Sequence, residues 1–131
     1  MVKVKATLGT ENYYTEVIAG ENKLITDEPV DKGGKNKGFN PFEILATSLA
    51  SCTAATLRMY IDRKNWDIPE INVEIELENF NQTKTTQFTR IIDFGKTILE
   101  SEQHEKLLKI ADACPVHKIL TNNIEVSTLL K

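Results

Sequence analysis

The feature that most constrains this chain is a long run, from Asn40 to Lys64, in which Pro41 is the only proline and glycine is absent. Asn40 is a favoured N-cap residue, Pro41 suits the first helical turn, and Glu43 stands where a capping box needs a carboxylate. Apolar or small side chains recur at helical spacing on one stripe, namely Phe42, Leu45, Leu49, Cys52, Thr56 and Met59. A second stripe is also apolar or small and comprises Ile44, Ala50 or Ser51, Ala54 or Ala55, and Leu57 or Ile61. The run predicts one long central helix that is buried on most of its surface.

The segment before this helix has the pattern of β-strands. Residues 2–8 alternate between apolar and polar side chains, and residues 13–19 and 23–27 are short and rich in β-branched or aromatic residues. Turn-forming residues separate the three segments, which predicts a meander of two hairpins. Residues 31–40 contain three glycines and predict an irregular loop, which either connects the sheet to the helix or lines a site.

The segment after the helix predicts two strands, two helices and a last strand. Residues 71–77 alternate between apolar and acidic or amide side chains, and residues 88–98 are expected to form the next strand. A helix is expected to open at Ser101 and to be interrupted at Pro115, after which a short helix runs to Leu120. Residues 122–130 alternate again and predict a closing strand. The expected order is β-β-β-α-β-β-α-α-β in one domain covering residues 1–131, which is the α+β class.

Composition excludes several classes of protein. With 131 residues, 40% apolar content and a net charge of −3, the chain suits a globular domain. Its 19 acidic and 16 basic residues lack the positive footprint of a nucleic-acid-binding protein. Residues 44–55, the longest strongly apolar stretch, are interrupted by threonine and serine, so we expect no membrane span. The N-terminus shows no apolar signal core, and we expect a cytoplasmic protein with two free or transiently paired cysteines.

The two cysteines occupy different kinds of position. Cys52 lies in the middle of the predicted helix, where a thiol is most often a small core residue and where no basic residue lies within one turn. Cys114 directly precedes Pro115, so the unpaired backbone N–H groups of the following turn would stabilise a thiolate there. His117 could add a positive partner, although a capping thiol without function fits the local spacing equally well.

These positions leave two chemical uses open. If Cys52 and Cys114 meet across the core, one thiol can attack an oxidant and the other can resolve the sulfenic acid as a disulfide. The rival use is a metal site built on Cys114 and His117. Since the sequence offers no second local pair of ligands, we expect no metal and no other cofactor.

Three stretches of the chain resemble the OsmC/Ohr family of thiol-dependent hydroperoxide reductases. Residues 33–45 carry Gly33-Gly34, Gly38 and Asn40-Pro41, and they continue to Ala50-Ser51-Cys52-Thr53. Residues 110–120 surround Cys114-Pro115 and resemble the family in the same way. Residues 56–64 are especially similar to OsmC-like proteins outside the two best-known subgroups. The resemblance covers essentially the whole chain, and the two cysteine motifs together are specific.

The resemblance implies a fold, an assembly and a reaction. The fold would be the OsmC-like α+β fold, and the assembly an intertwined homodimer with an active site at each interface. Cys52 matches the peroxidatic cysteine, which attacks the peroxide and becomes sulfenic acid, and Cys114 matches the resolving cysteine. Family members reduce organic hydroperoxides with dithiol reductants and use no metal or haem.

Two departures from the family pattern affect this expectation. The best-known subgroups activate the peroxidatic thiolate with an arginine on an N-terminal strand, whereas the arginines of this chain are Arg58, Arg63 and Arg90. Those subgroups also have a glutamate ten residues before the peroxidatic cysteine, where this chain has Phe42. Either Arg58 or a lysine, an arginine or His117 of a partner chain takes over, or peroxidase activity is weak. In the latter case the protein binds a small apolar ligand or senses redox state.

Overall fold

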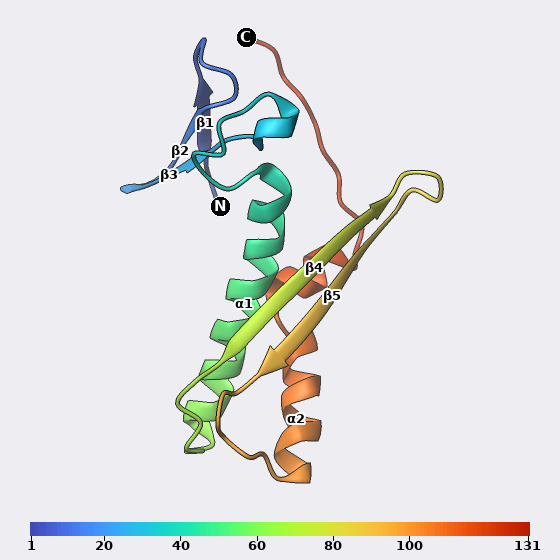
Figure 1. Cartoon of the computed structure of the whole chain (residues 1–131). Coiled ribbons are helices and arrows are strands. Elements are labelled where there is room, and N and C mark those ends of the chain that lie inside the picture. The colour runs from blue at the N-terminus through green and yellow to red at the C-terminus, as the bar shows by residue number, and fades with distance from the viewer. The chain divides into compact units, whose positions relative to one another are not determined.

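The computed structural model describes all 131 residues of the chain (Figure 1). Its contacts divide it into two compact units, Met1–Leu45 and Ala46–Lys131, which are described in turn. The strands are β1 (Lys5–Leu8), β2 (Thr15–Ala19), β3 (Asn22–Thr26), β4 (Asn72–Phe80) and β5 (Thr85–Asp93). The helices are α1 (Pro41–Arg63), α2 (Ser101–Asp112) and α3 (Pro115–Leu120), and a short 3-10 helix, η1, covers Val30–Lys32. The mixed α+β class is as predicted.

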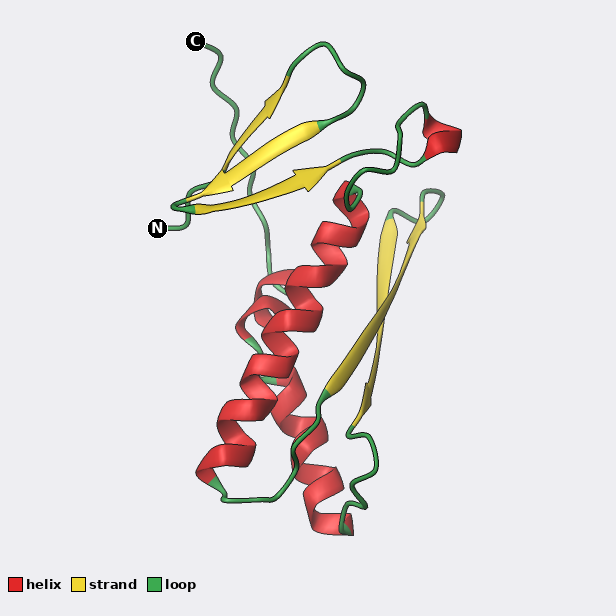
Figure 2. Cartoon of the chain, turned by 60° about the vertical axis from the view of Figure 1, so that its left-hand side comes forward, coloured by secondary structure: helices red, strands yellow, loops and turns green.

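The first unit holds the predicted meander. Strands β1, β2 and β3 form one antiparallel sheet in that order (Figure 2). The β2–β3 hairpin pairs Ala19 with Asn22, so only two residues make its turn. Gly20 has a φ of 61°, which a tight hairpin turn requires and which a glycine adopts without steric cost.

A single carboxylate organises the loop after β3. Asp27 is only 2% exposed, and its Oδ1 accepts the backbone N–H groups of Glu28 at 2.8 Å and Tyr13 at 3.3 Å. Its Oδ2 accepts the N–H groups of Lys37 at 3.2 Å and Lys35 at 3.3 Å. These bonds outweigh the burial of the carboxyl and hold its pKa below the usual value. The predicted glycine-rich loop is therefore tied to the sheet along most of its length.

Helix α1 begins as its sequence predicts. Asn40 Oδ1 accepts the backbone N–H of Glu43 at 2.9 Å, and Glu43 Oε1 accepts the N–H of Asn40 at 2.9 Å, which is a complete capping box. By length and composition α1 is apolar enough to cross a membrane, but the core helices of soluble proteins meet the same criterion.

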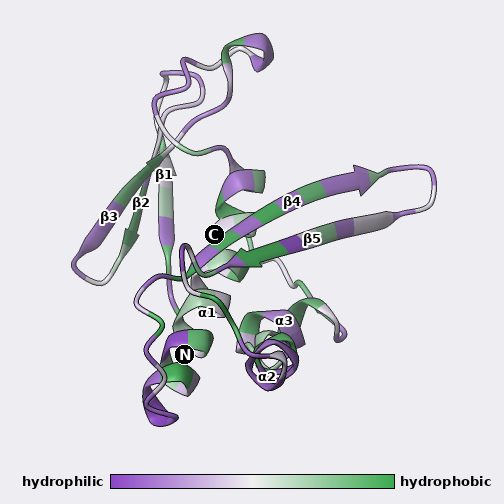
Figure 3. Ribbon diagram, turned by 60° about the horizontal axis from the view of Figure 1, so that its bottom comes forward, coloured by the Kyte–Doolittle hydropathy of each residue, from purple (hydrophilic) through white to green (hydrophobic).

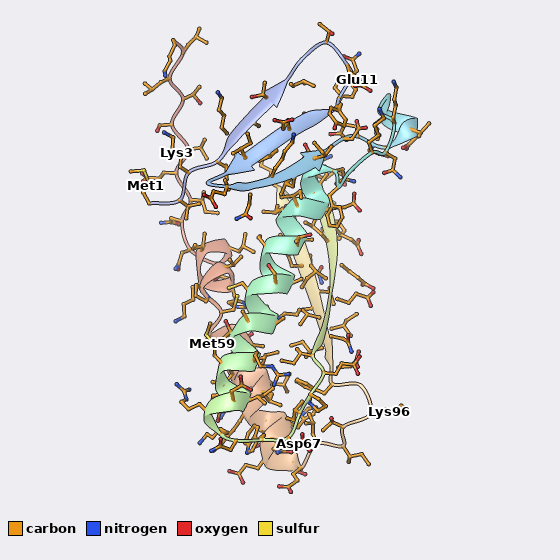
Figure 4. All side chains as sticks on the ribbon, turned by 90° about the vertical axis from the view of Figure 1, so that its left-hand side faces the viewer. Met1, Lys3, Glu11, Met59, Asp67 and Lys96 are labelled. Atoms are coloured by element: carbon orange, nitrogen blue, oxygen red, sulfur yellow. The ribbon has the colours of Figure 1, made fainter.

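The predicted burial of this central helix is wrong for a single chain. Its buried residues are Leu49, Thr53, Leu57, Tyr60 and Ile61. Phe42 is 60% exposed, and Met59, labelled in Figure 4, is 71% exposed. The helical periodicity correctly predicted apolar residues on two stripes of α1, but within one chain many of these residues remain exposed.

The second unit packs a β-hairpin against helices. Strands β4 and β5 pair antiparallel from Asn72 with Asp93 to Phe80 with Thr85. Figure 3 shows the alternation of hydrophobic and hydrophilic residues as bands along β4. In Figures 1 and 2 the hairpin lies over α1 and α2 and forms a second layer. The core between them contains Leu57, Tyr60, Ile61, Ile68, Phe94, Leu107 and Ala111.

The closing strand predicted for residues 122–130 is absent from the structure, so the observed order is β-β-β-α-β-β-α-α. The segment has no regular secondary structure and is exposed throughout, with Ile124 at 59% and Leu130 at 100%. An alternating sequence forms a strand only when another strand offers its backbone hydrogen bonds, and this segment is paired with none. The alternation in residues 122–130 therefore predicts a strand, but no strand of the single chain pairs with this segment.

Candidate thiol active site

The structure brings the two predicted cysteines together. Cys52 lies in the middle of α1, Cys114 is the N-cap residue of α3, and the two thiols lie close enough for each to shift the pKa of the other. Both are free thiols; Cys114 is fully buried, and Cys52 is partly exposed. The more accessible sulfur can therefore meet a reactant while the buried one stands directly behind it.

The end of α2 places Cys114. The helix stops at Asp112, and the Cys114 N–H still donates to the carbonyl of Ala111 at 3.3 Å. Cys114 then leaves helical geometry, with φ −56° and ψ 129°, because a residue before proline is driven into an extended conformation. Pro115 starts α3, and the Cys114 side chain at its N-cap makes no capping hydrogen bond. The nearby backbone N–H groups of His117 and Val116 nonetheless help to lower the pKa of Cys114.

The surroundings shift the pKa values of the two thiols in opposite directions. Burial opposes ionisation of Cys114, but hydrogen bonds from Cys52, from the His117 and Val116 backbone and from the Thr53 hydroxyl outweigh it and lower the pKa of Cys114. Burial, followed by the hydrogen bond to Cys114, raises the pKa of Cys52. The two pKa values therefore shift in opposite directions, and Cys114 is the more acidic of the two thiols.

An arginine lies beside this pair. Arg90 occupies an inward-facing position of β5, between Phe88 and Ile92, and its side chain is only 12% exposed. Its Nη1 donates to Thr53 Oγ1 at 3.0 Å, and Thr53 directly follows Cys52 in α1. The guanidinium therefore reaches the residue that directly follows Cys52, and the Thr53 hydroxyl in turn donates to the Leu49 carbonyl at 2.7 Å.

The other end of the guanidinium holds the two helices that flank Cys114. Arg90 Nη2 donates to Asp112 Oδ1 at 2.8 Å and lies 3.2 Å from His117 Nδ1. Because a guanidinium only donates, His117 Nδ1 is the acceptor and the proton of the neutral ring is on Nε2. Arg90 thereby connects β5 with α1, α2 and α3 around the buried sulfur.

The sequence interpretation found part of this site. Cys52, Cys114 and His117 lie together as expected, whereas Arg58 does not reach the thiols. Its guanidinium donates to Asp62 at 3.1 Å and to the Ile68 carbonyl at 2.9 Å.

Sequence reasoning missed Arg90, Thr53 and Asp112. The available signal was a charged residue in the apolar phase of an alternating strand: Phe88, Arg90 and Ile92 are all partly buried while their neighbours are exposed.

A metal ion has few candidate ligands here. Cys114 and His117 belong to no group of three or more His, Cys, Asp or Glu side chains that could hold one. What the arrangement offers is thiol chemistry, with a partly exposed sulfur on Cys52 and a buried, more acidic sulfur on Cys114 beside it.

The fold and the site define a small α+β protein with a cysteine pair suited to redox chemistry. Residues 34–129 match the family model described as OsmC-like protein, and the chain therefore belongs to the OsmC-like family, as the sequence motifs predicted. No curated protein matches the chain significantly.

Solved structures agree with this assignment. A candidate osmotic stress induced and detoxification response protein of Psychrobacter arcticus is 29% identical, with a TM-score of 0.78 over 91% of this chain and 88% of that one. An OsmC-like protein of Mycoplasma pneumoniae is 20% identical, with a TM-score of 0.71 over 92% and 86%. The organic hydroperoxide resistance protein OhrB of Bacillus subtilis is 21% identical, with a TM-score of 0.63 over 94% and 92%. The last two show the shared fold.

Proposed function

We propose that the protein reduces organic hydroperoxides through Cys52 and Cys114. The observation that carries this proposal is the pair of neighbouring thiols, in which a partly exposed Cys52 lies beside the buried Cys114 at the N-cap of α3. Membership of the OsmC-like family supports it, as does the fold shared with an organic hydroperoxide resistance protein.

The first step moves a proton between the two thiols. Cys52 passes its proton to the Cys114 thiolate, and the resulting Cys52 thiolate attacks one oxygen of the hydroperoxide. A sulfur–oxygen bond forms, the O–O bond breaks, and the leaving alkoxide takes the proton back from Cys114 to become an alcohol. Two electrons pass from the Cys52 sulfur to the peroxide, which leaves Cys52 as sulfenic acid and Cys114 again as thiolate.

The second step closes the disulfide. The Cys114 thiolate attacks the Cys52 sulfur, the sulfur–sulfur bond forms, and hydroxide leaves and is protonated to water by the solvent. A dithiol reductant then exchanges with the disulfide, is itself oxidised to a disulfide, and returns the protein to its starting state. In this scheme Cys114 acts first as proton acceptor and then as nucleophile.

The proposal includes an intertwined homodimer in the cytoplasm, bound to neither membrane nor nucleic acid. Exposed apolar side chains support the dimer: Phe42 on α1 is 60% exposed, and Val126 and Leu129 in the C-terminal segment are 87% and 95% exposed. Sedimentation equilibrium measures the association directly. A monomer at micromolar concentration would remove this part of the proposal and leave the thiol chemistry to be judged by itself.

Stopped-flow consumption of an organic hydroperoxide, with a dithiol as reductant, tests the reaction. The chain has two cysteines, so each serine variant leaves a single thiol to follow. Cys52→Ser should abolish turnover, while Cys114→Ser should permit one oxidation and accumulate a Cys52 sulfenic acid that a dimedone adduct reveals by mass. Turnover in Cys52→Ser equal to that of the wild type would overturn the proposal.

A second candidate function is redox sensing or binding of a small apolar ligand by the same pair. The observation that favours it is the raised pKa of Cys52, since a protonated thiol reacts slowly with peroxide. Under this alternative a single oxidation closes the disulfide without sustained turnover, or a ligand raises the melting temperature without peroxide loss. Sustained turnover of many equivalents decides for the peroxidase.

A further inference from the structure

One side chain joins the parts of the chain that carry the two cysteines. Arg90 occupies an inward-facing position of β5, and its side chain is only 12% exposed. Nη1 donates to Thr53 Oγ1 at 3.0 Å. Nη2 donates to Asp112 Oδ1 at 2.8 Å and lies 3.2 Å from His117 Nδ1. A single planar guanidinium therefore spans from α1 to the junction of α2 and α3.

The three contacts lie next to the cysteines along the chain. Thr53 directly follows Cys52 in α1. Asp112 comes two residues before Cys114, and His117 comes three residues after it. Because the reach of a chain is fixed by its number of residues, holding a close neighbour also restrains the cysteine beside it. The guanidinium therefore restrains the separation of the segment around Cys52 from the segment around Cys114.

The α1 end of this connection is fixed to the helix backbone. Thr53 is fully buried, and its hydroxyl proton goes to the Leu49 carbonyl at 2.7 Å. The oxygen still has a lone pair with which it accepts from Arg90. The hydroxyl cannot turn away without losing one of these two bonds. The contact with Arg90 therefore holds the backbone of α1 beside Cys52, and not a freely rotating side chain.

The other end is fixed on both sides of a helix break. Asp112 is the last residue of α2, and His117 lies in α3 beyond the break at Cys114. Helix α3 has six residues, none of which is buried, so apolar packing gives it little support. Contacts from Arg90 to both helices therefore matter more for the position of Cys114 than they would in a well-packed element.

We propose that Arg90 is a positioning residue that holds the Cys52 and Cys114 segments at the separation from which their disulfide closes. The proposal deepens the proposed function, on which its importance for turnover rests, but the disulfide equilibrium that it concerns needs no peroxide. Holding two reacting groups in place raises their effective concentration and favours the bond between them. Arg90 thereby stabilises the oxidised pair and makes its reduction potential more negative.

Exchange with dithiothreitol measures this equilibrium. The protein dithiol gives up two electrons and two protons as the sulfur–sulfur bond forms, and oxidised dithiothreitol takes them up as its own disulfide breaks. Mass after alkylation counts the free thiols at each ratio of oxidised to reduced dithiothreitol. Since the chain has two cysteines, the loss of both thiols in a monomeric mass reports the disulfide between them.

Arg90→Met keeps the aliphatic stem of the side chain and removes the contacts of the guanidinium. It should lower the constant for disulfide formation by about tenfold, which is the effect of one hydrogen bond to a charged group. For a two-electron couple this raises the reduction potential by about 30 mV. Arg90→Lys keeps the charge but lacks the planar fork, so it should restore the potential only in part.

A second substitution breaks only the α1 end of the connection. Thr53→Val keeps the shape of the side chain but offers no acceptor, so it should raise the potential by a similar amount. The Arg90→Met, Thr53→Val double variant should shift little beyond the larger single effect, because a connection broken at one end no longer joins the segments. Thr53→Ser keeps the hydroxyl and should stay close to the wild type.

Matched controls separate positioning from a general loss of stability. Arg58→Met removes another arginine with two hydrogen bonds, to Asp62 and to the Ile68 carbonyl, and should leave the potential unchanged. A purely structural role would destabilise the oxidised and reduced proteins equally and would not move the potential. Under the proposal Arg90→Met destabilises the oxidised protein more than the reduced one in urea unfolding, because the connection favours the disulfide only in the folded state.

The possible outcomes are distinct from those for catalysis. Folded Arg90→Met and Thr53→Val proteins with the potential of the wild type, or a more negative one, would overturn the inference even if the wild type turns over peroxide. If both potentials rise while the wild type fails to turn over peroxide, the proposed function is wrong and the role of Arg90 stands. If Arg90→Met does not fold by circular dichroism, Thr53→Val decides in the same way.

Discussion

Closing the bond between Cys52 and Cys114 should make the folded protein measurably more stable. The two residues are 62 positions apart, and a cross-link over such a length removes enough freedom from the unfolded chain to raise the free energy of unfolding by about 4 kcal/mol. For a chain of 131 residues that corresponds to about 15 °C in melting temperature. These values are upper limits, since they count the unfolded state only.

Oxidation also weakens interactions in the folded state, which reduces the gain in stability. The Thr53 side chain and the backbone of Val116 and His117 favour the ionised form of Cys114, and a neutral disulfide sulfur gains less from them. Losing the charge-assisted part of these bonds costs about 2 kcal/mol. The expected net effect of oxidation is therefore a gain of about 2 kcal/mol, or a rise of about 7 °C.

Calorimetry of the reduced and oxidised proteins checks this value. Both samples must have the same protein concentration, because association shifts the melting temperature by mass action. The Cys52→Ser, Cys114→Ser double variant is the control, and oxidant should leave its melting temperature unchanged. An oxidised wild type that melts at or below the reduced form would refute the reasoning, because the native positions of the two sulfurs would then resist the bond.

Three further predictions concern the fold. Leu57→Ala empties a fully buried position in the core and should cost about 2–5 kcal/mol in urea unfolding, while Met59→Ala, at an exposed position of the same helix, should stay within about 0.5 kcal/mol. Asp27→Asn should remove a stabilisation that is full above the ordinary aspartate pKa and is lost as pH falls through the lower pKa of the folded state, so melting temperatures of wild type and variant should converge in acid. Gly38→Ala drives a Cβ into the backbone of β3 and should destabilise the protein, whereas Gly9→Ala meets open space and should not.

Features decided by neighbouring residues could be predicted from the sequence. The capping box of α1 needs only Asn40 and Glu43, and the break before α3 needs only Pro115 after Cys114. The meander follows from short strands separated by turn residues, which fix their own pairing. In each case the determining contact spans a few residues, so a local pattern carries it.

Features that depend on contacts between residues far apart in the sequence could not be predicted in this way. Arg90 meets Thr53 across 37 positions, and that meeting depends on how the β4–β5 hairpin packs on α1. The strand expected at residues 122–130 and the full burial of α1 each require a surface that one copy of the chain does not provide. Periodicity shows that such a face is apolar, but it does not name what covers it.

The backbone donors at Cys114 have a consequence for how this site can change over generations. Val116 and His117 lower the pKa of Cys114 through their amide N–H groups, which every amino acid except proline supplies. Substitution of Val116 or His117 by any residue except proline can therefore change the side chain and keep the backbone N–H group that lowers the pKa of Cys114. The contribution of Thr53 depends on its side chain and is open to selection. Drift in the OsmC-like family can thus change the acidity of the buried thiol through one helix residue while the amides beside it stay in place.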